Sequence, residues 1–220
     1  MYFSNIPKKS LGQNFLIDNN IIKKIIKIEN ITAKKTVLEI GPGYGSLTNK
    51  IHQQGPKNIY AIEKDKLLCE KLKKKFYKVK NIKIINDDIL NLLKINKFGK
   101  NITIFGNLPY NISTKIIVDL IMLKKWPPWY NNLIFMFQKE VADRIIANDN
   151  SKKFGRLAIL CNWRLDVIKH FDVSKNCFFP KPKVNSTVLS FKPKKNIYKI
   201  RNPKNLENVT RILFSNRRKM

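Results

Sequence analysis

The stretch TVLEIGPGYGSLTNKIHQQ, residues 36–54, decides the fold. Its first five residues form a short aliphatic run, which predicts a buried strand. The glycine-rich turn GPGYG at 41–45 stops this strand, and the residues from Ser46 onward suit a helix. A strand, a tight turn and a helix in this order are typical of an α/β sheet that binds a ligand beside the turn.

The same alternation extends in both directions. Isoleucines at helical spacing behind Asp18, a candidate cap, predict an amphipathic helix over 20–28. Candidate strands and helices then alternate at 58–65, 67–76, 82–88, 102–110, 113–123, 132–137 and 138–147, followed by apolar segments at 156–163, 167–173 and 186–191. This order predicts an α/β domain with a mainly parallel sheet. Pro180 and Pro182, before the last strand, predict an antiparallel hairpin at the sheet edge.

The chain is strongly basic. Its 220 residues suit one main domain with room for a small lobe, and they include 44 Lys and Arg against 15 Asp and Glu, a formal charge of +29. A field of this sign attracts phosphate backbones, so we expect an RNA or DNA partner. Because Lys, Asn and Ile are abundant throughout, a compositional bias explains the charge equally well.

Cysteine and histidine usage argues against a disulfide framework and against a metal site. Cys69, Cys161 and Cys177 are widely spaced, and His52 and His170 are the remaining possible zinc ligands. No run is apolar enough for a signal segment or a membrane span. We therefore expect a protein of the reducing cytoplasm that holds no metal.

The glycines of the turn indicate a nucleotide-like cofactor. Gly41, Gly43 and Gly45 lack a Cβ, which lets the backbone bend sharply and approach a ligand. Glu63 stands 22 residues beyond Gly41, at the end of the next strand, where a carboxylate can accept both ribose hydroxyls. Pro42 removes a donor that a pyrophosphate would use, which favours S-adenosylmethionine. The alternative is a purely structural turn.

Asp88 ends the third predicted strand and is placed to accept a hydrogen bond from the amino group of a cofactor's adenine. Asp87 is its rival for this role. The alternative for both residues is a turn or helix-cap aspartate.

The segment Asn107-Leu108-Pro109-Tyr110 carries the most specific chemistry. An exocyclic adenine amine is a poor nucleophile because its lone pair is delocalised into the ring. The side-chain oxygen of Asn107 and the neighbouring backbone carbonyl can accept the two N–H bonds and direct the lone pair toward a methyl sulfonium. Tyr110 can stack on the base, and no strong general base is required. The alternative is an ordinary Asn-Pro turn with a core tyrosine.

A second aromatic candidate is Phe178, in the stiff loop CFFPKPKV at 177–184. A base held between Tyr110 and Phe178 would gain roughly 1–3 kcal/mol of stacking per face, which offsets the cost of unstacking. Core packing is the alternative for this phenylalanine.

Together these segments resemble the ribosomal RNA adenine N6,N6-dimethyltransferase family, and specifically its housekeeping small-subunit branch. The resemblance covers nearly the whole chain through SLGQNFLID (10–18), VLEIGPGYGSLT (37–48), AIEKD (61–65), NDDIL (86–90), GNLPYNIST (106–114), FQKEVADRI (137–145), FGRL (154–157) and FFPKPKVNSTV (178–188). It implies a Rossmann-like class I S-adenosylmethionine-dependent methyltransferase with a mainly parallel seven-stranded sheet. The implied reaction is dimethylation of two adjacent adenosines in 16S-type ribosomal RNA during ribosome biogenesis.

The resemblance also implies site residues. In the family the loop containing GQNF folds over the cofactor, so a binding role passes to Asn14, Leu16, Gly41, Glu63, Asp88 and Asn107. Tyr110 and Phe178 inherit the base clamp. The implied partner is the immature small ribosomal subunit, and we expect a monomer.

One departure concerns the end of the chain. Family members usually carry a further helical lobe after an FSNRRK-like segment, and this chain stops at Met220. We therefore expect a methyltransferase domain over 1–195, with 1–30 covering the cofactor, and a truncated lobe over 196–220. Three rival functions stay open: a ribosome-assembly factor with little catalysis, a large-subunit RNA adenine methyltransferase, and a DNA adenine methyltransferase.

Overall fold

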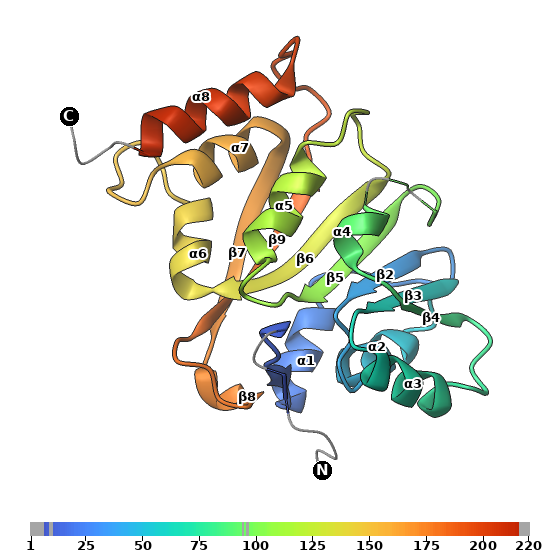
Figure 1. Ribbon diagram of the computed structural model, residues 1–220. Coiled ribbons are helices and arrows are strands. Elements are labelled where there is room, and N and C mark those ends of the chain that lie inside the picture. Colours follow the sequence, from blue (N-terminus) through green and yellow to red (C-terminus); the bar gives the residue numbers. More distant parts are fainter. Residues whose placement is uncertain (1–6, 9–10, 94, 96, 216–220) are drawn as a thin grey trace.

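The computed structural model describes residues 7, 8, 11–93, 95 and 97–215. Its main sheet has seven strands in the order β4-β3-β2-β5-β6-β9-β7 (Figure 1). The strands are β2 (Thr36–Ile40), β3 (Asn58–Glu63), β4 (Ile82–Asn86), β5 (Ile102–Asn107), β6 (Tyr130–Gln138), β7 (Leu165–Val173) and β9 (Ser186–Pro193). Strands β2 to β6 are parallel, whereas β9 is antiparallel to both β6 and β7. The predicted mainly parallel sheet and its antiparallel edge hairpin are confirmed.

Helices cover both faces of this sheet. They are α1 (Asn19–Ile26), α2 (Ser46–His52), α3 (Lys66–Lys75), α4 (Ile89–Leu92), α5 (Ser113–Ile121), α6 (Lys139–Ile145), α7 (Arg156–Arg164) and α8 (Pro203–Ser215). Successive residues of β2 point to opposite faces. Leu38 and Ile40 pack with residues of α4, α5 and α7, and Val37 packs with residues of α1, α2 and α3.

The predicted opening helix begins where its cap places it. Asp18 Oδ1 accepts hydrogen bonds from the backbone N–H groups of Asn20 (2.8 Å) and Ile21 (3.1 Å). These bonds satisfy donors that the first turn of a helix leaves unpaired. Buried Ile22 and Ile25 then fix α1 against the sheet, so the segment just before Asp18 is held beside the carboxyl ends of the strands.

A second, two-stranded sheet was not predicted. It pairs β1 (Phe15–Leu16) antiparallel to β8 (Phe178–Phe179), and Ile17 N donates to Cys177 O at 2.9 Å beside it. Figure 1 shows these two segments, distant in sequence, side by side. The pairing joins the GQNF segment to the proline-rich loop.

The C-terminal helix packs on α7. Arg156 Nη2 donates to Glu207 Oε1 at 2.6 Å, and the Phe154 and Phe214 rings lie 6.5 Å apart. The predicted helix in the tail is confirmed over Pro203–Ser215, and residues 216–220, which the prediction also included, lie outside the described part. The domain boundary near Lys195 and the interpretation of 196–220 as a truncated lobe stay predictions.

Arg164, the last residue of α7, binds the C-terminal end of α5. Although only 4% exposed, it donates from Nη1 to the carbonyls of Ile121 (2.6 Å) and Leu123 (2.9 Å), at the end of α5. Its guanidinium also lies against the rings of Trp126 and Trp163, 4.6 and 4.0 Å from their centroids. Unpaired carbonyls at a buried helix end are thereby satisfied by a cation.

Replacing Arg164 by Met should therefore destabilise the fold. The variant keeps an apolar stem but leaves both carbonyls without this donor, and we expect the free energy of unfolding in urea to fall by about 2–4 kcal/mol. Exposed Arg144 of α6 gives the control, since Arg144→Met should change stability by less than about 0.5 kcal/mol. Equal unfolding midpoints for the two variants would contradict the role of Arg164.

Candidate active site

A pocket opens at the carboxyl ends of β2, β3 and β5. Strands β3 and β5 lie on opposite sides of β2, so the strand order reverses here, and this is the position at which open α/β sheets bind ligands. The pocket walls come from residues 11–17, 39–44, 62–64, 87–89 and 106–112. We call residues 11–17 the strap, because this segment precedes α1 and lines the pocket without being a strand of the main sheet or a loop that follows one.

Most of the predicted site residues meet in this pocket. Its lining includes Asn14, Leu16, Gly41, Gly43, Glu63, Asp88, Asn107, Leu108, Pro109 and Tyr110, but not Gly45 or Phe178. At Gly45 the backbone has φ +74°, and an added Cβ would lie 2.8 Å from Leu72 Cδ2, so this glycine serves packing behind the pocket. Phe178 is 3% exposed within the core and supports the strap from β8.

The glycine turn closes tightly against the strap. Gly43 has φ +58°, and an added Cβ would lie 2.8 Å from Phe15 Cδ1. Gly43 N donates to Glu63 Oε2 at 3.1 Å. The absent side chain therefore allows a left-handed turn and a close approach of the strap at one point.

Glu63 is held in place by backbone donors. Its Oε2 accepts from Gly43 N, and its Oε1 accepts from Asp65 N at 2.9 Å. The residue is 7% exposed, and burial raises the pKa of its carboxyl above the usual range. Each carboxylate oxygen keeps acceptor capacity for a further donor in the pocket.

A second buried carboxylate in the pocket wall, Glu39, was missed by the sequence analysis. It is the last residue but one of β2, is 1% exposed, and its Oε2 has no hydrogen-bond partner among the described residues. Burial raises its pKa to about 7. A buried acceptor without a partner costs free energy, which a donor or cation bound in the pocket would relieve. Its position on a strand directly before the glycine turn was the available signal.

The two aspartates after β4 have local partners. Asp88 Oδ1 caps α4 through Leu90 N at 3.0 Å, and its Oδ2 pairs with Lys64 Nζ at 2.9 Å. Asp87 Oδ1 accepts from Asp88 N at 2.6 Å. Both residues line the pocket, so the helix-cap interpretation of Asp88 holds alongside its predicted ligand role, and Asp87 stays its rival.

Asn107 lines the pocket, and its amide nitrogen has a partner on the strap. Its Nδ2 donates to Asn14 O on the strap at 2.8 Å, which leaves the side-chain oxygen as the acceptor. The Tyr110 hydroxyl lies 2.7 Å from Ser186 Oγ, and Ser113 Oγ donates to Tyr110 O at 3.2 Å. The site therefore holds an amide acceptor and an aromatic ring on one wall and carboxylates on the other.

No group of three or more His, Cys, Asp or Glu side chains that could hold a metal ion occurs within the described ranges. Likewise, none of the helices in these ranges is long and apolar enough to cross a membrane. By their own chemistry, the carboxylates of the pocket can accept from hydroxyls or pair with cations, and the amide oxygen can accept from an amine.

Comparison with known proteins identifies the family. The profile of the ribosomal RNA adenine dimethylase family matches residues 5–220. Ribosomal RNA small subunit methyltransferase A of Pelagibacter ubique is 51% identical over 213 residues, covering 97% of this chain and 80% of that protein. The protein of the same name from Wolbachia pipientis of Culex pipiens is 40% identical, with the same two coverages.

Two solved structures show the same fold. A dimethyladenosine transferase from Plasmodium falciparum superposes with a TM-score of 0.79 at 32% identity, covering 91% of this chain and 70% of that one. The 23S rRNA methyltransferase ErmE superposes with a TM-score of 0.73 at 23% identity, covering 92% and 79%. Sequence and structure agree that this chain belongs to the ribosomal RNA adenine dimethylase family.

Proposed function

We propose that this chain transfers methyl groups from S-adenosylmethionine to the N6 amines of two adjacent adenosines in small-subunit ribosomal RNA. The observation that carries the proposal is the position of Asn107, which lines the pocket while its amide nitrogen donates to Asn14 O of the strap, so its side-chain oxygen is available as an acceptor. Beside it, Leu108 and Pro109 form the turn, and Tyr110 presents its ring.

The residues of the pocket fit the cofactor. S-adenosylmethionine supplies an electrophilic methyl group on a sulfonium, and it also carries an ammonium, a ribose and an adenine. The Glu39 carboxylate, whose Oε2 has no partner among the described residues, suits the cationic end, and Glu63 suits the ribose hydroxyls. Asp88, with Asp87 as its rival, suits the adenine amino group, while Asn14, Leu16, Gly41 and Gly43 form the surrounding wall.

The reaction needs alignment more than proton transfer. The Asn107 oxygen and the adjacent backbone carbonyl of Leu108 accept the two N–H bonds of the target amine, which turns its lone pair toward the methyl group. Tyr110 stacks on the extruded base, and its bond to Ser186 fixes the ring. The amine attacks as a neutral group, and the product ammonium loses its proton to water.

Phe178 can stack on the target base only if its side chain moves. Its ring is buried behind the strap, and to stack on a base it would have to leave the core. Because β8 pairs with β1, a movement of Phe178 would also shift Leu16, which lines the pocket. Stacking by Tyr110 alone requires no such movement.

The small-subunit substrate is favoured by the relatives. Relatives that are 51% and 39% identical to this chain are named for the small subunit, whereas the likeness to the 23S rRNA enzyme lies at 23% identity and supports the fold alone. We propose that the chain acts as a monomer on immature small subunits, in the compartment where they assemble.

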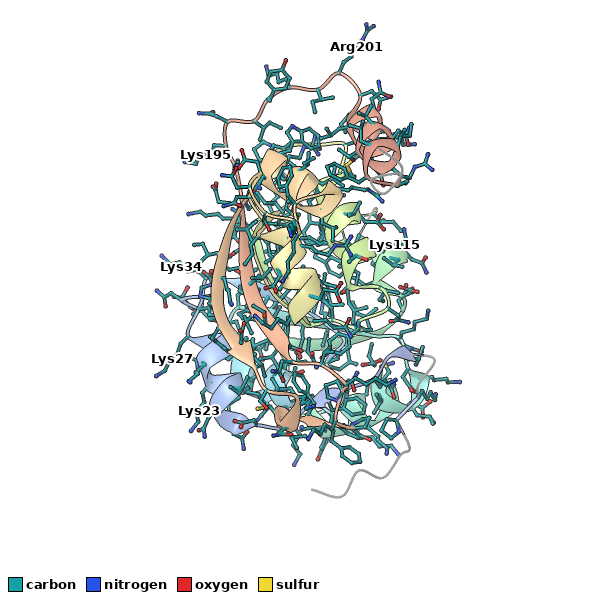
Figure 2. The ribbon with its side chains drawn as sticks, turned by 90° about the vertical axis from the view of Figure 1, so that its left-hand side faces the viewer. Lys23, Lys27, Lys34, Lys115, Lys195 and Arg201 are labelled. Atoms are coloured by element: carbon teal, nitrogen blue, oxygen red, sulfur yellow. The ribbon has the colours of Figure 1, made fainter. Side chains whose placement is uncertain are left out.

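Positive charge surrounds the molecule. Figure 2 shows Lys23, Lys27 and Lys34 projecting from one side, Lys115 from the other, and Lys195 and Arg201 near one end. Such a distribution supports attraction to RNA from many directions, and it leaves the choice of target adenosine to the pocket.

The decisive experiment is methyl transfer from labelled S-adenosylmethionine to undermethylated small subunits. We expect label in N6,N6-dimethyladenosine at adjacent positions of the small-subunit RNA, and far less in large-subunit RNA or duplex DNA. Absence of transfer by folded protein that binds the cofactor would contradict the proposal. Full subunit maturation by a catalytically inactive variant would instead favour the assembly role.

Substituting Asn107 by Ala should abolish turnover. The variant removes the amide acceptor, so we expect kcat to fall at least about a thousandfold, while cofactor affinity stays within about tenfold. Asn81 provides the control, since its Nδ2 also donates to a backbone carbonyl, Pro56 O at 2.9 Å, at the far end of the strands. Asn81→Ala should keep normal turnover, and an equal loss in both variants would argue for a structural effect.

Substituting Glu39 by Gln should change both the pH dependence of stability and cofactor affinity. Between the usual pKa of 4.5 and about 7, the folded chain holds a proton on Glu39 that the unfolded chain has lost. Stability therefore falls as the pH rises through this window, by about 1–3 kcal/mol from this group. Glu39→Gln removes this contribution, and it should also weaken S-adenosylmethionine binding at least about tenfold.

Urea unfolding of the ligand-free protein from pH 5 to pH 8 measures the first effect, and calorimetric titration with the cofactor measures the second. Glu70, exposed on α3, gives the control variant Glu70→Gln, which should change neither quantity. Parallel stability curves for Glu39→Gln and the parent protein would refute the assignment of the pH dependence to Glu39.

A further inference from the structure

The strap is held at both of its ends. Its C-terminal end runs through β1, which pairs with β8, into the capped helix α1. At the other end, Gln13 Nε2 donates to Asp65 Oδ2 at 3.1 Å, and Lys8 Nζ pairs with the same oxygen at 3.0 Å. Lys8 N also donates to Gln13 Oε1 at 2.7 Å, so the three residues form one cluster.

The two carboxylate oxygens of Asp65 accept hydrogen bonds from different partners. Oδ1 caps α3 by accepting from Leu67 N at 3.0 Å, while Oδ2 serves the strap. The Asp65 side chain is 4% exposed, against 47% for Lys8. Burial alone would raise its pKa, but the bonds from Lys8 and Gln13 outweigh that effect and lower the pKa below its usual range. The carboxylate is therefore charged at neutral pH.

The same residue touches the predicted ribose acceptor. Asp65 N donates to Glu63 Oε1 at 2.9 Å, and the two side chains belong to one short loop after β3. The strap in turn provides the backbone carbonyl Asn14 O, which accepts a hydrogen bond from Asn107 Nδ2. Asp65 thus contacts both Glu63, on the wall that would hold the cofactor, and Gln13 of the strap, which crosses the pocket.

We propose that Asp65 is a positioning residue that latches the strap across the cofactor pocket and ties this latch to Glu63. The inference rests on the proposed function, because it assumes that S-adenosylmethionine occupies the pocket. Since the strap supplies residues 11–17 of the lining, a ligand beneath it is retained while Gln13 and Lys8 stay bound to Asp65. Loss of the latch exposes the pocket and speeds dissociation.

Asp65→Asn is the first test variant. An asparagine still caps α3 as well as aspartate does, but it removes the ion pair with Lys8. We expect the Kd for S-adenosylmethionine, its dissociation rate and its KM to rise about tenfold, while kcat at saturating cofactor and KM for RNA change less than about twofold. Amide hydrogens of residues 11–17 should exchange faster in the ligand-free variant, and bound cofactor should slow them.

Two further variants leave the α3 cap untouched. Lys8→Met and Gln13→Ala each remove one bond to Asp65 from the strap side, and both should raise the Kd for S-adenosylmethionine in the same direction. In the double variant Lys8→Met with Asp65→Asn, the effects should not add, because both substitutions remove the same ion pair. Lys8→Met and Gln13→Ala test the latch even if Asp65→Asn fails to fold.

Asp143 supplies the matched control. It is a partly buried aspartate of α6 that pairs with Lys153 Nζ at 2.7 Å, and it does not line the pocket. Asp143→Asn should leave the cofactor Kd and the exchange of the strap unchanged.

The outcomes separate the latch from the proposed function. An unchanged Kd and dissociation rate in Asp65→Asn, or equal weakening in Asp143→Asn, would overturn the latch. Calorimetric and stopped-flow binding of S-adenosylmethionine needs no RNA, so failure of the parent protein to methylate RNA would refute the function while the binding data still judge the latch. A parent protein that binds no S-adenosylmethionine would overturn both.

Discussion

The site depends on a topological constraint. The parallel strands β3 and β5 lie on the two sides of β2, and the helices that follow β2 and β5, α2 and α5, pack on opposite faces of the sheet. A crevice is left at the carboxyl edge, and the glycine turn borders it. Everything else in the site is arranged around this gap. The carboxylates reach it from the ends of β2 and β3, the asparagine motif reaches it from the end of β5, and the strap crosses it.

The polar groups of the crevice are only partly satisfied within the chain. Glu63 has backbone donors, whereas Glu39 is buried with one oxygen unpaired. A buried unpaired oxygen lowers the stability of the ligand-free protein, and a cationic ligand that pairs with it would raise the stability again. The proposed methyl transfer would use both walls, with the carboxylates beside the cationic cofactor and the Asn107 oxygen beside the neutral amine.

Much of this could be predicted from the sequence, because the signals are local. The apolar run before GPGYG, the cap Asp18 and the spacing of Glu63 each depend on a few neighbouring residues, and the structure places all of them as predicted. Tertiary partners were harder to predict. Strands β1 and β8 have two residues each, too few for any periodicity, and the burial of Phe178 follows from their pairing. Glu39 was missed because the strand pattern alone does not say which side chains of a strand line a pocket.

The position of β9 has a consequence for how the protein is made. This strand is inserted between β6 and β7, so the strand synthesised last among the seven occupies an interior place in the sheet. Ser186 Oγ, at its start, also lies 2.7 Å from the Tyr110 hydroxyl, within hydrogen-bonding distance. A nascent chain emerging from the exit tunnel can form the parallel half of the sheet early, but the Tyr110 side of the pocket lacks its Ser186 partner until β9 has been translated.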